Sequence, residues 1–169
     1  MVTAAGNTGY GYNTDFVQGT VAAGQGQTIN DPGNTEAAIT VGSTHRDMPH
    51  TYGVSYFSSK GPTGDGRAKP DLIAPGEKIL SCAAGETREK IASKPDMPSE
   101  IDYVEDSGTS MAAAHVSGVI AAFPSVRPEF AGRPAEVKRI FTSTATDLGR
   151  VPDFQGSGLV DLMRTIQSV

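Results

Sequence analysis

The feature that most constrains this chain is the segment 109–123, TSMAAAHVSGVIAAF. Apolar residues recur here with the spacing of an α-helix and continue almost all the way round it. A helix that is apolar on every side is stable in water only where other elements cover it. Gly118 lowers the helix propensity by about 1 kcal/mol relative to alanine but does not end the pattern. We therefore expect a buried helix around which the other elements pack.

The elements expected around this helix are short strands and two further helices. The β-branched apolar run at 37–43 is bounded by turn residues, which is typical of a buried strand. Further short extended segments are expected at 1–7, 54–59, 71–76 and 78–85. Amphipathic helices are expected at 134–146, which has a proline near its first turn, and at 158–169. This mixture indicates an α/β layered domain.

Two long segments lack a sustained period. Residues 8–35 are rich in Gly, Asn and Thr and predict a long surface loop, a kind of segment that often carries function. Residues 86–105 are charged and contain proline, which predicts a surface insertion. The total of 169 residues suits one domain, spanning 1–169.

Composition excludes several classes of partner. The 14 Lys and Arg residues are scattered among 19 Asp and Glu, so no nucleic-acid partner is expected. No apolar run near a terminus approaches the roughly 18 residues of a membrane span, and the N-terminus lacks a charged targeting region, so no membrane partner is expected either. Cys82 is the single cysteine, which predicts a small buried apolar residue rather than a nucleophile. Localisation stays open between secreted and cytoplasmic.

A set of ordered motifs narrows the fold further. GTSMAAAHVSG at 108–118 resembles the nucleophile signature of the subtilisin-like serine proteases. TAAGN at 3–7 resembles the family's oxyanion strand, and DPGNTEAAITVGS at 31–43 resembles the segment beyond its substrate pocket. FSSKGPTGDGRAKPDLIAPGEKILS at 57–81 and GSGLVD at 156–161 follow in family order. The resemblance implies the C-terminal half of a subtilisin-like α/β fold, three-layered, with a mostly parallel sheet truncated at its N-terminal side.

The resemblance makes Ser110 the catalytic nucleophile and Asn7 the side-chain donor of an oxyanion hole. A serine at the N-terminus of a helix has its hydroxyl and amide near the positive end of the helix dipole, which suits acyl transfer. Taken alone, the serine could be a helix-capping residue and the asparagine a turn residue. The five motifs together favour the catalytic roles.

Substrate binding is expected beside these two residues. The resemblance assigns it to the following set: Ala4, Ala5, Gly6, Asn30 and Thr109. Asn30 lies where the family builds the floor of its main specificity pocket, and a larger polar floor favours smaller or polar substrate side chains. Pro32 matches a family proline that usually follows a cis peptide bond. An ordinary trans turn is the alternative at that proline.

A serine nucleophile also needs a base and an orienting carboxylate. In the family both precede the oxyanion strand, which here begins at residue 1, so we expect them on an N-terminal segment. His115 matches a non-catalytic family histidine, for which packing or a local hydrogen bond is expected. His45 and His50, with Asp47, could form a metal cluster, but their loop spacing favours a solvated turn. Calcium often accompanies the family, although no acidic loop of fixed spacing is visible.

Two functions remain open from the sequence. The first is a serine endopeptidase whose chain alone hydrolyses peptides hardly at all. The second is a non-catalytic half-domain that acts as a binding or assembly module. In both cases an open sheet edge and a bared part of the 109–123 helix invite a partner, either the missing N-terminal half or a second copy. Ala114 replaces a family proline, which relaxes the helix start and shifts the serine slightly.

Overall fold

The computed structural model describes residues 1–15, 19–94 and 102–169. Its centre is a parallel sheet of β1 (Val2–Ala4), β4 (Ile39–His45) and β5 (Leu72–Glu77), in the order β1-β4-β5. Ile73 also forms a parallel bridge with Leu159, so the C-terminal segment lies alongside β5. These strands confirm the extended segments expected at 1–7, 37–43 and 71–76, and with the helices they confirm the subtilisin-like α/β fold class.

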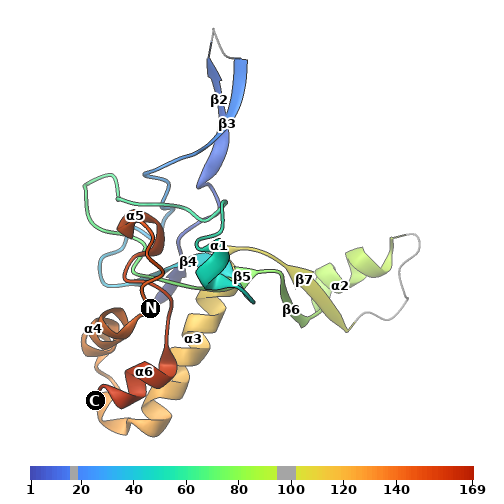
Figure 1. Ribbon diagram of the computed structural model, residues 1–169. Helices are drawn as coiled ribbons and strands as arrows, with labels where there is room; N and C mark the ends of the chain where they lie inside the picture. The colour runs from blue at the N-terminus through green and yellow to red at the C-terminus, as the bar shows by residue number, and fades with distance from the viewer. Residues whose placement is uncertain (16–18, 95–101) are drawn as a thin grey trace.

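Four helices lie together on one face of this sheet (Figure 1). They are α3 (Thr109–Val126), the 3₁₀ turn η1 (Pro128–Phe130), α4 (Pro134–Thr144) and α6 (Leu162–Gln167). Alternate strand residues point toward them, because side chains of a strand alternate between its two faces. The shared core is an apolar cluster of Ile39, Val41, Leu72, Ala74, Ala112, Val116, Phe123, Val137 and Phe141.

The opposite face of the sheet is covered by the loops between residues 53 and 71. The short helices α1 (Pro49–Tyr52) and α5 (Pro152–Gln155) accompany these loops. Thr40 points to this side and donates its hydroxyl to the Gly33 carbonyl. Ser58 reaches β4 through the amide of Ser43. Polar side chains therefore fix these loops to the central sheet.

The segment 8–35 is not a featureless loop, so that prediction was wrong. It contains an antiparallel hairpin of β2 (Tyr10–Asp15) and β3 (Gly19–Gly24), which projects from the body of the molecule (Figure 1). Its two strands pair residue by residue from Tyr10 opposite Gly24 to Asp15 opposite Gly19.

A second projection joins β5 to α3. It consists of β6 (Ile79–Cys82), the helix α2 (Gly85–Ala92) and β7 (Tyr103–Asp106), which pairs antiparallel with β6. The charged insertion expected at 86–105 therefore lies at the surface where it is described, and residues 95–101 lie outside the described part. Cys82 is exposed, contrary to the expected burial, because β6 belongs to this projecting arm and not to the central sheet. Residues 54–59 form no strand beyond a single bridge from Val54 to Thr44.

The helix α3 is covered on only one side. Ala112, Val116 and Phe123 are fully buried against the sheet, whereas Ala114, Gly118 and several neighbours are exposed. The expectation of burial all round was therefore wrong, and the expectation of a partly bared helix is confirmed. By length and composition α3 could also cross a membrane, but core helices of soluble proteins pass the same test, and one such helix is weak evidence.

Candidate active site

The candidate site lies where the end of β1 meets the start of α3. The Asn7 side-chain oxygen Oδ1 accepts hydrogen bonds from the backbone amide of Thr109 at 2.9 Å and from its hydroxyl at 3.0 Å. The same hydroxyl oxygen accepts from the amide of Gly6 at 3.1 Å. Thr109 is 1% exposed, so these hydrogen bonds form away from water and tie the two elements firmly together.

This anchoring decides which way the Asn7 carboxamide faces. With Oδ1 occupied by two donors, the amide nitrogen Nδ2 is left to donate elsewhere. A Cβ atom at position 108 would lie 3.3 Å from Nδ2, so Gly108 keeps the space beside that nitrogen open. Gly108 is itself held by a hydrogen bond of 2.7 Å from its amide to the Gly76 carbonyl at the end of β5. The site is thus built from the ends of two strands and one helix.

Ser110 lies in the first turn of α3 and is exposed. Within the described residues, neither its hydroxyl nor its backbone amide has a hydrogen-bond partner. An unpaired amide in the first turn of a helix carries part of the positive charge of the helix dipole. Ser110 therefore presents a free hydroxyl next to an available N–H donor.

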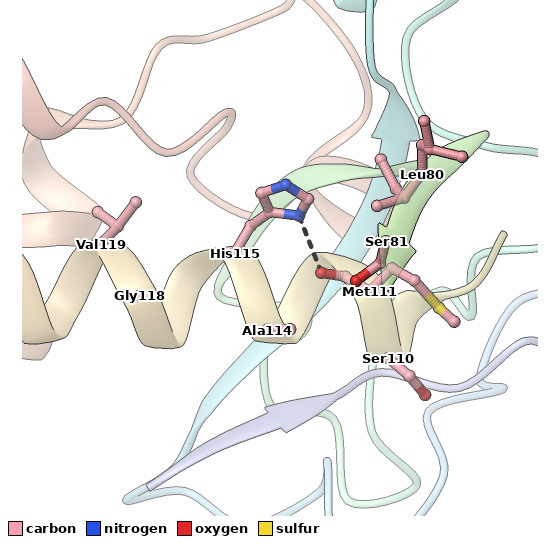
Figure 2. A pocket seen from close by; sticks show the side chains of 9 residues that line it. Leu80, Ser81, Ser110, Met111, Ala114, His115, Gly118 and Val119 are labelled. Atoms are coloured by element: carbon pink, nitrogen blue, oxygen red, sulfur yellow. Dashed lines mark hydrogen bonds between the residues drawn. The ribbon is translucent and has the colours of Figure 1, made fainter. Parts of the chain in front are cut away.

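A groove of about 680 Å³ runs along the outer face of α3 and includes Ser110 (Figure 2). One wall comes from β6 and the other from the exposed side of the helix. The lining residues are Ile79, Leu80, Ser81, Ser110, Met111, Ala114, His115, Gly118 and Val119. The surface next to the serine is consequently mostly apolar.

The structure keeps the three histidines apart from Ser110. The Nδ1 atom of His115 lies 3.0 Å from the Met111 carbonyl one turn earlier, and the ring points away from the serine hydroxyl (Figure 2). The Nδ1 atom of His45 accepts from the amides of Asp47 and Met48, and its ring packs on Tyr52. His50 is exposed in α1. No imidazole in the described part of the chain bonds the hydroxyl, and these residues hold no group of three metal-ligating side chains.

The segment expected to bind substrate assembles beside Gly6. The amide of Asn30 donates to the Ala5 carbonyl at 2.9 Å, and a Cβ atom at Gly6 would lie 2.6 Å from the Asn30 side-chain nitrogen. The peptide bond between Asp31 and Pro32 is cis, as predicted. Ala4, Ala5, Gly6 and Asn30 are thus brought together next to Asn7.

An ion cluster that the sequence did not reveal holds the 31–38 loop. Lys69 Nζ, which is 3% exposed, donates to the Ala38 carbonyl and lies 2.6 Å from the Asp71 carboxylate. Lys138 of α4 lies 2.9 Å from the other Asp71 oxygen and donates to the Glu36 and Ala38 carbonyls. Burial lowers the pKa of Lys69, and the Asp71 carboxylate opposes that shift. The cluster fixes the 31–38 loop, which follows the substrate-binding candidate Asn30.

Comparison with known proteins places the chain in a family. The sequence model of the subtilase family matches residues 1–158. The chain belongs to the subtilase family. An uncharacterised protein of Aquifex aeolicus is 34% identical over 149 residues, covering 83% of this chain and 64% of that protein. Serine protease AprX of Bacillus subtilis is 33% identical over 156 residues, covering 86% of this chain and 34% of that protein.

Solved structures agree with this assignment. A protease from Pseudoalteromonas arctica superimposes with a TM-score of 0.67 at 26% identity, over 98% of this chain and 41% of that one. Fervidolysin from Fervidobacterium pennivorans gives a TM-score of 0.64 at 27% identity, over 99% of this chain and 22% of that one. The subtilase chain described here therefore spans less than two thirds of the length of each relative and structure named.

Proposed function

We propose that the chain is the nucleophile-bearing part of a serine endopeptidase. Ser110 attacks the peptide carbonyl carbon, and the oxyanion that forms accepts hydrogen bonds from Asn7 Nδ2 and the Ser110 amide. The observation that carries this proposal is the double anchoring of Asn7 Oδ1 by Thr109, because it leaves Nδ2 as a directed donor. A capping or turn role for Asn7 would not require that the free nitrogen face the start of α3.

The reaction runs through an acyl-enzyme. As the Ser110 oxygen bonds to the carbonyl carbon, its proton passes to a general base, which returns it to the departing amine when the carbon–nitrogen bond breaks. Water then attacks the ester by the same steps and releases the second product. The residues of the pocket segment, Ala4, Ala5, Gly6 and Asn30, hold the substrate on the acyl side of the bond.

The base and its orienting acid are proposed to come from polypeptide N-terminal to Met1. Two features support this. The outer groove of α3 presents apolar surface directly beside Ser110, and β1 lies at the edge of the described sheet with β4 as its single strand neighbour there. A docked segment that covers the groove would bring an imidazole to the hydroxyl and shield the site from water. The encoding DNA upstream of Met1 is then expected to carry D-[ST]-G and H-G-T-H-like motifs.

A fluorophosphonate probe tests this proposal, because it reacts only with an activated serine. The chain alone is expected to label hardly at all, and adding a polypeptide with the family's Asp and His segment is expected to produce labelling at Ser110. Ser110→Ala should abolish the signal. Asn7→Ala should lower turnover by roughly 10²–10³, a magnitude taken from the corresponding asparagine of subtilisin itself. Ala114→Arg, in the floor of the groove, should block complementation without unfolding the chain.

The alternative is a non-catalytic half-domain whose uncovered face captures a partner. The bared apolar side of α3 favours it, since such a surface commonly marks an interaction site. It predicts that a partner binds while Ser110 stays unlabelled. Labelling at Ser110 after complementation would eliminate this alternative.

A further inference from the structure

The β2–β3 hairpin carries an aromatic face. Tyr10 and Tyr12 lie two residues apart on β2 and therefore point to the same side of the hairpin. Their directly opposed residues on β3 are Gly24 and Ala22, which are too small to cover the rings. Tyr12 is 75% exposed and Tyr10 is 42% exposed. Two rings thus stand open on one face of a projecting element.

The aromatic face continues onto the segment before Ser58. The Tyr10 ring meets the Tyr56 ring edge to face, with centroids 5.4 Å apart, and Tyr56 meets Phe57 in the same way. Tyr56 is 65% exposed. We call Tyr10, Tyr12 and Tyr56 the tyrosine strip. Such rings offer large contact area at low entropic cost and dominate many binding surfaces.

A buried lysine bonds the backbone segments that carry the tyrosine strip. Lys60 is 5% exposed, and its Nζ donates to the carbonyls of Gly9, Tyr56 and Ser58 at 2.7, 2.9 and 3.0 Å. Its ammonium group also lies 5.3 Å from the centre of the Phe154 ring. No carboxylate pairs with it among the described residues. One charged group therefore joins the base of the hairpin to the segment that bears Tyr56, at the cost of its own desolvation.

The strip is continuous with the candidate active site. Gly6 accepts a hydrogen bond from the amide of Ser59, and the Gly9 amide donates to the Phe57 carbonyl, both at 2.9 Å. Tyr10 follows Asn7 by three residues, a span of at most about 10 Å. Residues of an extended polypeptide repeat about every 3.3 Å, so a substrate held at Ser110 is expected to come near Tyr10 within a few residues of the scissile bond.

We propose that the tyrosine strip is a specificity-determining surface that takes apolar or aromatic side chains of the substrate polypeptide near its scissile bond. This inference rests on the proposed function for the position of that bond. Tyr10 and Tyr12 are exposed on one face of a projecting hairpin, which suits contact with an extended chain rather than with a small molecule. Lys60 acts as a positioning residue for it.

Tyrosine-ring NMR on the Ser110→Ala chain tests the proposal directly. The probes are a ten-residue alanine-glycine peptide with two phenylalanines and its twin with two serines. We expect the ring signals of the strip to shift with the phenylalanine peptide and to stay still with the serine twin. Tyr52 and Tyr103 are comparably exposed, at 63% and 61%, and serve as internal controls. Equal shifts at all five tyrosines, or no shift in the strip, would overturn the proposal.

Paired variants measure the size of the effect. Tyr10→Ser combined with Tyr12→Ser should weaken binding of the phenylalanine peptide at least about tenfold, as expected for loss of a central aromatic contact. Val21→Ser lies on the opposite face of the same hairpin, across from Asn13, and should leave binding unchanged. Equal losses in both variants would point to general damage to the hairpin and count against the strip. Shifts caused by a soluble oligosaccharide but not by peptide would also overturn it.

This experiment separates the strip from the catalytic proposal. Fluorophosphonate labelling reports on Ser110, whereas ring shifts in the Ser110→Ala chain require no chemistry. Strip shifts without labelling after complementation would leave a peptide-binding surface and refute the peptidase. Labelling without strip shifts would retain the peptidase and refute the strip.

Discussion

The two faces of α3 have similar amino-acid composition and different surroundings. On the sheet side, Ala112, Val116 and Phe123 are fully buried in the core cluster. On the outer side, Ala114 and Gly118 are exposed in the groove that begins at Ser110. Apolar residues all round a helix therefore indicate two covering surfaces, of which the described residues provide one. The reactive hydroxyl lies at the end of the uncovered face.

The largest expected effect comes from the covered face. Phe123→Ala removes a fully buried ring that packs against Phe130 and Phe141, and should lower the free energy of unfolding by about 3–5 kcal/mol. Denaturant titration followed by circular dichroism measures it. Val126→Ala, at an exposed position of the same helix, should change stability by less than about 0.5 kcal/mol. Similar losses in the two variants would show that the faces do not differ as described.

The next effect concerns the junction between β1 and α3. Thr109→Val keeps the shape of the side chain but removes the hydroxyl shared by Gly6 and Asn7, which should cost about 1–3 kcal/mol. The Asn7 carboxamide also loses one of its two anchors, so labelling of the complemented protein should fall more than stability alone explains. Thr142→Val is the matched control, because that hydroxyl donates to the Lys138 and Arg139 carbonyls of its own helix. Unchanged labelling in Thr109→Val would contradict the proposed role of the anchoring.

A substitution on the uncovered face should stabilise the chain. Apart from the adjacent residues and the nearby backbone of its own helix, no described atom lies within 4 Å of a Cβ built on Gly118, so Gly118→Ala has room and gains helix propensity. We expect the free energy of unfolding to rise by roughly 0.5–1 kcal/mol. The same methyl group should hinder a segment that packs closely in the groove, so complementation should weaken. Stabilisation together with unimpaired complementation would mean that the partner does not contact this part of the helix.

The smallest expected effect is a pH dependence of the free energy of unfolding, which comes from two buried lysines. Burial lowers the pKa of Lys60 and of Lys69 from the ordinary 10.5. Between the lowered value and 10.5 the unfolded chain binds more protons than the folded one, so the free energy of unfolding should rise with pH in this alkaline window. Lys60→Met should flatten the rise. Gly118→Ala should displace the whole curve upward at constant slope, and a changed slope would contradict the assignment to the lysines.

The elements that were predicted correctly are those whose structure is indicated by a contiguous pattern in the sequence. The run at 37–43 became β4, the amphipathic segment from 134 became α4, and the proline at position 32 follows a cis bond. These features depend on a β-branched apolar run bounded by turn residues, on a proline near a helix start and on a family motif. The catalytic candidates Ser110 and Asn7 were also proposed from sequence, because their motifs are contiguous.

Other features depend on contacts that no local pattern contains. No local pattern predicts the hairpin in 8–35, because its strands are held by pairing across small residues such as Gly24 and not by a buried apolar face. Cys82 is exposed because β6 belongs to a projecting arm. One side of α3 is bare because none of the described residues covers it. The Thr109 bridge joins residues 102 positions apart, and the Asp71 cluster draws a lysine from α4.

That long-range bridge has a consequence for the order of assembly. Closing a loop of about 100 residues is entropically costly, so contacts between the first strand and Thr109, about two thirds of the way along the chain, form after local helices and hairpins. The Asn7 side chain is oriented only when Thr109 is in place, and Thr109 begins the helix that packs on β1, β4 and β5. A nascent or misassembled polypeptide would thus carry the serine without its oriented oxyanion donor, and peptide hydrolysis would begin only after folding is complete.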